Sequence, residues 1–187
     1  LPLRRAAAQG QPTLDRLARW NVGFPPGGSS DTVARIYAER LRGVYAPQVV
    51  VENRPGAGGR LALETVKAAR PDGATLVQTP ASMLTVYPHI YPRTLRYEAL
   101  ADFVPVTPVC AFPFAMAVRA DHPAKTFAEF IAWAKRQAGA VPFASPAAGA
   151  VPHFLGVQMA KAVGIQLTHV PYRGGAPAVQ ALHERGG

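Results

Sequence analysis

The chain has 187 residues, of which 49% are hydrophobic and 17% charged, the balance of a globular protein with one domain or two small lobes. Its formal net charge of +9 comes from basic residues spread along the whole sequence, without a clustered stripe. This spread argues against a nucleic-acid-binding protein and favours a positive field that attracts small acidic solutes. A single cysteine, Cys110, excludes an intramolecular disulfide and is expected to be a buried structural thiol.

The N-terminal residues 1–12 have the features of a leader. The run Ala6-Ala7-Ala8 is similar to the small-residue cleavage site of a secretory signal peptide. We therefore expect residues 1–12 to be a disordered leader or signal remnant, and the protein to be exported. The sequence has no run of about 18 apolar residues, so it predicts no membrane span.

Strands and helices alternate along the first half of the chain. Short apolar or β-branched runs between turn residues predict strands, and apolar residues at helical spacing, such as Val33, Tyr37 and Leu41, predict helices. The expected elements are a strand over 20–24, a helix over 30–43, a strand over 48–52, a helix over 60–70, a strand over 75–79 and a helix over 82–91 broken near Pro88. This order implies a parallel sheet with helices on its faces.

The pattern changes where prolines interrupt a strand-like stretch over 97–113, and this change indicates a crossing between two lobes with a hinge near 105–110. The expected elements after the crossing are a strand over 113–120, a helix over 126–137 opened by a Thr126–Glu129 capping box, a strand over 141–145, a helix over 153–163, a strand over 165–172 and a helix over 177–184. We therefore predict an α/β fold with lobe 1 over 13–106 and lobe 2 over 107–187.

The loop 23–31 has the composition of an anion-binding loop. Gly27 and Gly28 would let backbone N–H groups approach a ligand, and Ser29 or Ser30 would cap a helix whose first amides also point outward. An ordinary strand-to-helix turn uses the same residue types, so spacing alone leaves both interpretations open. A second strand, small-residue loop and helix follow at 144–153, and two such loops in facing lobes predict a pincer around a negative group.

Six motifs occur in a characteristic order: GFPPGGSSD at 23–31, VVENRPGAGG at 50–59, PDGATL at 71–76, DFVPV at 102–106, PH at 152–153 and HVPYRG at 169–174. Together they resemble the Bug family, the periplasmic solute-binding proteins of tripartite tricarboxylate transporters. The resemblance extends over residues 20–187. It implies a type II periplasmic-binding-protein fold, in which two lobes, each a sheet flanked by helices, close over a ligand like a Venus flytrap.

The resemblance implies a receptor and not an enzyme. Such a receptor binds a small carboxylate, whether a di- or tricarboxylate, an amino acid or an aromatic acid, and delivers it to the subunits of a membrane transporter. It implies a periplasmic location in a Gram-negative bacterium after export by a signal peptide, and a protein that is not membrane-embedded. No cofactor, metal or nucleic acid is expected, and the solute itself is not identified.

In that family, backbone amides and ordered waters of two facing loops hold the carboxylate, and these loops match residues 25–31 and 145–153. Ala147 and Ala150 replace the usual Gly and Ser, which puts the second loop in doubt as a cradle. The resemblance and the strand ends together give the expected ligand-binding residues: Phe24, Pro25, Pro26, Gly27, Gly28, Ser29, Ser30, Asp31, Thr79, Ser82, Ser145, Ala148, Gly149, Ala150, His153, Pro171 and Tyr172.

Some of these residues have a second interpretation. Asp31 would repel an anion, so we expect it to accept hydrogen bonds from helix or loop amides, or to contact a ligand amine. His153 either orients the second loop or contacts ligand, and Ser82 either contacts ligand or caps a helix. Arg173 either pairs with a second ligand carboxylate or is solvated.

Two further hypotheses come from other classes. A serine-dependent α/β enzyme would use Ser29, Ser82 or Ser145 with His153, but the sequence has no nucleophile elbow. The family's chains also continue beyond the helix over 177–184, which indicates an incomplete second lobe here. If the chain ended at 187, exposed apolar surface, self-association or a remnant that no longer binds solute would be expected.

Overall fold

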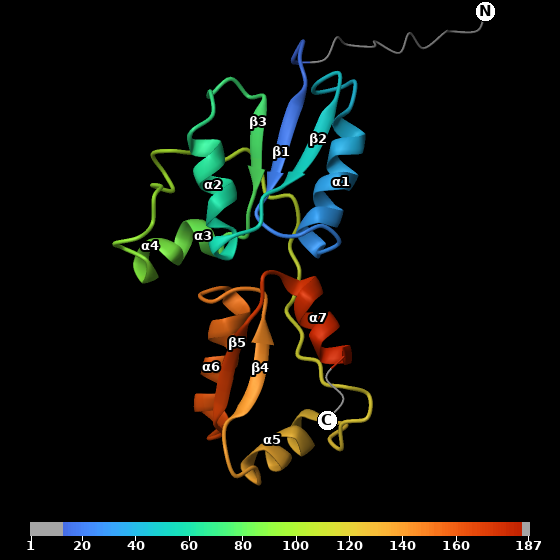
Figure 1. Cartoon of the computed structure of the whole chain (residues 1–187), viewed down its shortest axis with the longest axis vertical. Coiled ribbons are helices and arrows are strands. Elements are labelled where there is room, and N and C mark those ends of the chain that lie inside the picture. Colours follow the sequence, from blue (N-terminus) through green and yellow to red (C-terminus); the bar gives the residue numbers. More distant parts are fainter. Residues whose placement is uncertain (1–12, 185–187) are drawn as a thin grey trace, which may run out of the picture.

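Two parallel sheets form the two lobes of the chain, and a computed structural model describes residues 13–184 (Figure 1). The first sheet has the strand order β2-β1-β3, and the second pairs β4 with β5. The strands are β1 (Ala18–Val22), β2 (Val49–Asn53), β3 (Thr75–Gln78), β4 (Val141–Ser145) and β5 (Leu167–Pro171). The parallel pairing confirms the prediction from the alternating elements. The predicted leader at 1–12 lies outside the described residues.

Helices connect the strands and cover the sheets. In lobe 1 they are α1 (Ser29–Leu41), the 3-10 turn η1 (Ala57–Gly59), α2 (Arg60–Lys67), α3 (Ser82–Thr85) and α4 (Tyr87–Ile90). In lobe 2 they are α5 (Phe127–Lys135), α6 (Val151–Val163) and α7 (Gly175–Glu184). The break predicted near Pro88 separates α3 from α4. Among residues 13–184, no helix has the length and apolar character needed to cross a membrane.

Lobe 1 is built around β1, which pairs with β2 on one side and β3 on the other. Its Trp20 and Val22 are buried and pack with Ala34 of α1 on one face of the sheet. On the other face, Leu63 of α2 packs with Met83 in a second cluster. A strand covered by helices on both faces is buried along most of its length, and in β1 only Arg19 is exposed.

The core of lobe 2 lies between α5, α6 and the β4–β5 pair. Phe130 of α5 packs there with Ala160 of α6 and with Ile165, which precedes β5. The predicted capping box is present, since the Thr126 side chain accepts from the backbone N–H of Glu129 and the Glu129 carboxylate accepts from the backbone of Thr126. With Thr126 as its cap, α5 begins at Phe127, one residue after the predicted start.

The two sheets point their carboxyl ends at each other. In Figure 1 the arrows of β1, β2 and β3 point toward lobe 2, and the arrow of β4 points toward lobe 1. The loops that follow the strands of both lobes therefore face one another. Ligands of open parallel sheets bind beyond the carboxyl ends of the strands, so this arrangement brings two such edges to one place.

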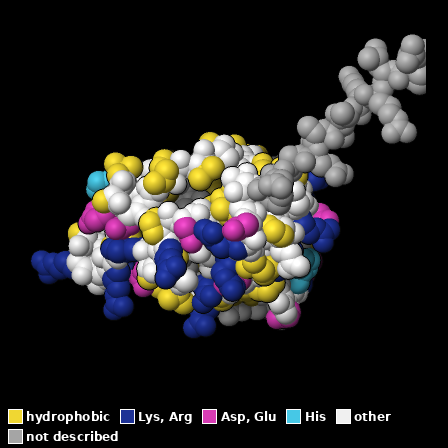
Figure 2. Space-filling view, turned by 90° about the horizontal axis from the view of Figure 1, so that it is seen from above, with side chains coloured by type: hydrophobic (Ala, Val, Ile, Leu, Met, Phe, Trp, Pro, Cys, Tyr) yellow, Lys and Arg dark blue, Asp and Glu magenta, His cyan; other side chains and the backbone are white. Residues whose placement is uncertain are grey.

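Basic and acidic side chains are interspersed on the surface. Figure 2, seen from the lobe 1 end, shows Lys and Arg side chains next to Asp and Glu side chains over this face. Ion pairs such as Arg16–Asp72 at 3.2 Å and Arg42–Glu39 at 2.6 Å join them. Because these pairs are exposed, each contributes only about 0–1 kcal/mol to stability.

The strand predicted over 113–120 is wrong. Residues 103–119 belong to no helix or strand, and every residue from 110 to 118 is exposed, including Phe112, Phe114 and Met116. The apolar alternation is that of a strand, but a strand also needs a neighbour to pair with, and the described residues provide none here. Cys110 is likewise exposed and not buried as expected.

Candidate functional site

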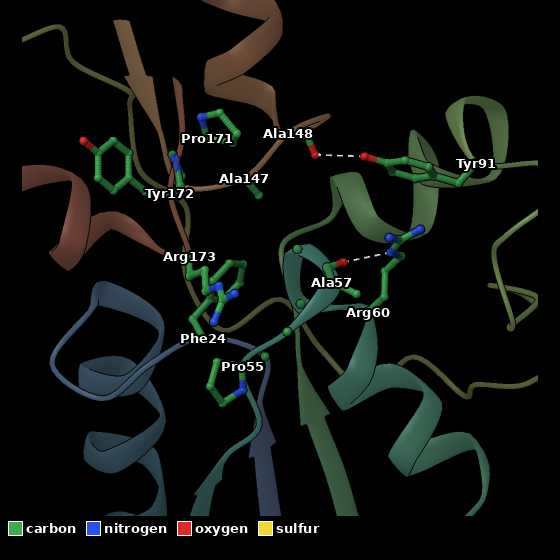
Figure 3. A pocket seen from close by; sticks show the side chains of 15 residues that line it. Phe24, Pro55, Ala57, Arg60, Tyr91, Ala147, Ala148, Pro171, Tyr172 and Arg173 are labelled. Atoms are coloured by element: carbon green, nitrogen blue, oxygen red, sulfur yellow. Dashed lines mark hydrogen bonds between the residues drawn. The ribbon is translucent and has the colours of Figure 1, made fainter. Parts of the chain in front are cut away.

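A cavity of about 330 Å³ lies between the facing loops of the two lobes (Figure 3). Its walls come from the loops after β1, β2, β4 and β5, with one residue from the segment after α4. The lining residues are Gly23, Phe24, Pro55, Gly56, Ala57, Gly58, Gly59, Arg60, Tyr91, Pro146, Ala147, Ala148, Pro171, Tyr172 and Arg173. The volume is within the range of small-molecule sites, and the position is that of ligand sites in parallel α/β sheets.

The loop after β2 packs its backbone against the end of β1. Gly58 and Gly59 have φ of 68° and 94°, which side chains rarely tolerate. A Cβ on Gly23 would lie 2.6 Å from the Gly59 carbonyl oxygen, so these two glycines touch backbone to backbone. This close packing leaves bare main chain, with its polar groups, along the cavity wall.

A buried carboxylate fixes the loop after β1. Asp31 accepts hydrogen bonds from the backbone N–H of Gly27 at 2.9 Å, from Asn53 Nδ2 at 2.9 Å and from Arg35 Nε at 3.0 Å. The Asn53 amide also donates to the Phe24 carbonyl at 3.0 Å, which ties the loop to β2. Burial raises the pKa of Asp31, but the bonds from Arg35, Gly27 and Asn53 outweigh it and lower the pKa overall. The prediction that Asp31 accepts hydrogen bonds from loop groups is confirmed.

The predicted serine cap of α1 is wrong. The helix begins at Ser29, so the cap position belongs to Gly28, whose backbone is extended and which has no side chain to accept a bond. The carboxylate of Asp31 accepts a hydrogen bond from the N–H of Gly27, the residue before the cap. Gly27, Gly28 and Ser29 line a different and more open hollow against α7.

Two stacked histidines, His153 and His169, contact the loop after β4 and fix its position. The buried Ser145 hydroxyl donates to the Ala147 carbonyl at 3.0 Å and lies 2.7 Å from His169 Nε2. The rings of His169 and His153 stack with centroids 3.8 Å apart, and His153 Nδ1 accepts from the Gly149 N–H at 3.0 Å. Burial and the neighbouring His153 lower the pKa of His169. These contacts favour the loop-orienting role among the two predicted for His153.

Tyrosines connect the lobes at the edge of the cavity. The Tyr91 hydroxyl donates to the Ala148 carbonyl at 3.3 Å, and the Tyr87 hydroxyl lies 3.2 Å from the Gly58 carbonyl and 3.4 Å from that of Ala148. Burial raises the pKa of Tyr87 to about 12, so it remains a neutral donor. The described arrangement is therefore one in which the lobes touch.

The profile of the tripartite tricarboxylate transporter receptor family matches residues 33–186. The chain belongs to this family. A UPF0065 protein of Cupriavidus necator is 33% identical over 177 residues, which are 95% of this chain and 53% of that protein. The chain thus spans about half the length of the curated relatives it matches.

Solved structures of periplasmic receptors show the same fold. Rpa4515 of R. palustris with adipate has a TM-score of 0.82 and 30% identity, over 91% of this chain and 56% of that one. MatC of Rhodopseudomonas palustris with bound malate has a TM-score of 0.74 and 32% identity, over 90% and 57%. The periplasmic binding protein BugD has a TM-score of 0.73 and 30% identity, over 90% and 56%. The predicted family and the two-lobed fold with an incomplete second lobe are confirmed.

The cavity of this receptor-family chain includes four of the predicted site residues, namely Phe24, Ala148, Pro171 and Tyr172. The predicted residues that line neither this cavity nor the hollow against α7 are Pro25, Pro26, Ser30, Asp31, Thr79, Ser82, Ser145, Gly149, Ala150 and His153. Thr79 contacts the Met83 sulfur at 2.9 Å, and Ser82 is buried in lobe 1. Ser82 does not cap α3 either, since Ala81 has the cap position and no side chain caps this helix.

Sequence reasoning missed much of the lining. Gly23, Pro146 and Ala147 lie within the predicted loops over 23–31 and 145–153 but were not among the chosen residues. Residues 55–60 and Tyr91 were missed, and Arg173 was weighed but not chosen. The run 55–59 did carry an indication, because it is glycine-rich and follows a strand as the first loop does. The sequence around Tyr91 gave no such indication, because Tyr91 lines the cavity only through the packing of one lobe on the other.

Proposed function

We propose that this chain is the solute-binding part of a periplasmic receptor that holds a small carboxylate between its lobes and delivers it to a tripartite tricarboxylate-type membrane transporter. The observation that carries the proposal is the cavity itself. Loops at the strand ends of both lobes face each other across it, main chain lines part of its wall, and the charged residues of its lining are both arginines. Family membership and the similar structures with adipate and with bound malate support the same ligand class.

The segment over 103–119 is the hinge in this proposal. Its first half is tied to lobe 1, because the Tyr37 hydroxyl donates to the Val109 carbonyl at 2.8 Å and Val109 packs against the lobe 1 core. The segment then runs to lobe 2 without regular structure. The lobe boundary predicted after residue 106 stays a prediction. A ligand that contacts both lobes stabilises the closed form, and that form alone presents both lobes to the transporter.

Binding without chemistry is part of the proposal. The Ser145 hydroxyl is buried, bonds the Ala147 carbonyl and does not line the cavity, so it is poorly placed to attack a bound solute. It also contacts His169 and not the His153 of the serine-enzyme hypothesis. Export through a signal peptide and a periplasmic location follow from the family and stay proposals for this chain.

Calorimetric titration of the full chain with mono-, di- and tricarboxylates, amino acids and aromatic acids tests the function. We expect one of them to bind with 1:1 stoichiometry and to be recovered unchanged. Ala148→Phe, which fills the cavity, should weaken binding about tenfold or more, whereas Ala162→Phe on the exposed side of α6 should not. Failure of every compound to bind would refute the proposal, and turnover of a bound compound would refute its non-enzymatic part.

A further inference from the structure

Two arginines from opposite lobes face the cavity between them. Of the 15 residues that line it, Arg60 and Arg173 are the charged ones, and the lining contains no Asp, Glu or Lys. Arg60 is the first residue of α2 in lobe 1, and Arg173 follows β5 in lobe 2. The cavity therefore has a positive charge on each side and no negative charge in its walls.

Arg60 is held in place and keeps most of its donors. Its Nε donates to the Ala57 carbonyl at 2.8 Å, and its guanidinium carbon lies 4.2 Å from the centre of the Tyr91 ring. A guanidinium has five N–H donors, of which this bond uses one. No carboxylate among residues 13–184 forms an ion pair with Arg60. Figure 3 shows the bond to Ala57 and the position beneath Tyr91.

Arg173 has a fixed backbone and a side chain that pairs with no described carboxylate. The residue before it, Tyr172, donates its N–H to the Ser145 carbonyl at 2.9 Å, and the residue after it, Gly174, donates to the Pro146 carbonyl at 2.9 Å. These bonds attach Arg173 to the loop after β4. Its exposed guanidinium has no ion pair within residues 13–184.

Other arginines of lobe 1 have acidic partners. Arg35 pairs with Asp31, and both Arg19 and Arg54 pair with Glu52. The contrast shows that acidic partners are present in lobe 1, but that none of those among residues 13–184 pairs with either arginine of the cavity. Two guanidinium groups without acidic partners repel each other weakly. The repulsion grows as closure of the lobes shortens the distance between them.

We infer that Arg60 and Arg173 form a two-sided charge clamp, through which the cavity prefers a ligand with two carboxylates over a ligand of the same length with one. This inference rests on the proposed function. Each arginine binds one end of a dicarboxylate, so the ligand bridges the lobes and removes their mutual repulsion. A monocarboxylate satisfies one arginine and leaves the other uncompensated. Charge-assisted hydrogen bonds are the strong ones, so the second contact is a large part of the difference.

Matched ligand pairs test the clamp. Succinate and butyrate, glutarate and pentanoate, and adipate and hexanoate each differ in one carboxylate at constant chain length. Calorimetry at neutral pH on the full chain should show about tenfold or tighter binding of the dicarboxylate in at least one pair. Raising the salt concentration should reduce this preference, because ions screen the partly exposed arginines.

Charge-removing variants assign the preference to these residues. Arg60→Gln and Arg173→Gln should each lower dicarboxylate affinity and bring the dicarboxylate-to-monocarboxylate ratio toward one, while Arg60→Lys and Arg173→Lys should retain part of the ratio. Arg70→Gln, which changes an exposed arginine outside the cavity lining, is the control and should retain the full ratio. The melting temperature without ligand identifies any variant that fails to fold, and for such a variant the matching Lys substitution provides the test.

The outcomes separate the inference from the function on which it rests. Equal affinity for the two members of every pair, or an equal loss of both after Arg→Gln, overturns the clamp and leaves the carboxylate receptor standing. A ratio that also falls in Arg70→Gln overturns it too, because net charge alone would then explain the preference. Absence of any carboxylate binding to the unmodified chain refutes the proposed function and the clamp together.

Discussion

Gly149 is the position where an added methyl group would most directly oppose contact between the lobes. Its φ is +78°, and a Cβ there would lie 2.3 Å from the Ile90 Cδ1 of lobe 1 and 3.4 Å from the Tyr91 hydroxyl oxygen. In Gly149→Ala, the left-handed backbone costs about 1 kcal/mol of folding free energy. Rotation of Ile90, whose exposed side chain ends at this atom, relieves part of the contact. The remaining contact weakens the Tyr91–Ala148 hydrogen bond, which costs the closed form up to about 1 kcal/mol more.

The two costs are separable by measurement. Urea denaturation should show a loss of about 1 kcal/mol in the free energy of unfolding, and calorimetry should show ligand affinity reduced about fivefold. Gly164→Ala is the matched control, because Gly164 also has a positive φ of 69° but nothing within 4 Å of its added Cβ. It should lose stability and keep affinity. The double variant Gly149→Ala/Ile90→Ala should recover affinity.

Unchanged affinity in Gly149→Ala would refute the idea that binding requires the lobes to meet at this point. An equal affinity loss in Gly164→Ala would refute the assignment of the effect to the contact between lobes.

Three further predictions concern the loops that hold the cavity. Asp31→Ala should cost about 1–3 kcal/mol of unfolding free energy in urea, because it leaves buried donors unpaired; a loss under 0.5 kcal/mol, roughly a surface effect, would contradict this. Since burial and His153 lower the pKa of His169 below its ordinary 6.5, the unfolded chain takes up the proton first, so stability should fall as the pH drops below 6.5. His169→Gln should flatten this pH dependence, and an unchanged slope would exclude His169 as its source. Gly23→Ala should destabilise by about 1–3 kcal/mol, because its Cβ meets backbone that cannot move aside. Gly28→Ala, whose nearest atom is 3.8 Å away, should be nearly neutral, and an equal loss in both would refute the packing argument.

Local patterns predicted most of the fold. Helices such as α5 were located to within two residues because the capping box and the apolar spacing act within one turn. The strand at 113–120 failed for the opposite reason, since its apolar alternation is local but its pairing depends on a neighbouring strand. The serine cap of α1 failed because the helix already includes Ser29 and Ser30, so the cap position falls on Gly28, which has no side chain.

The site was predicted in position but not in composition. Facing strand ends follow from the alternation of elements, and Phe24, Ala148, Pro171 and Tyr172 do line the cavity. The loop over 55–59 was missed because its place beside the first loop depends on the strand order β2-β1-β3, which the sequence does not state. Tyr91 and its contact with Ala148 depend on how the two lobes pack, and no local pattern reports that packing.

A crystal structure of the full chain with a carboxylate that it binds in solution is the most direct test of the central claim. We expect density for the ligand between the loops over 55–60 and 146–148, in contact with both lobes and chemically unchanged. Density only in the open hollow against α7, or on the outer surface of one lobe, would contradict a solute receptor that closes on its ligand at this cavity.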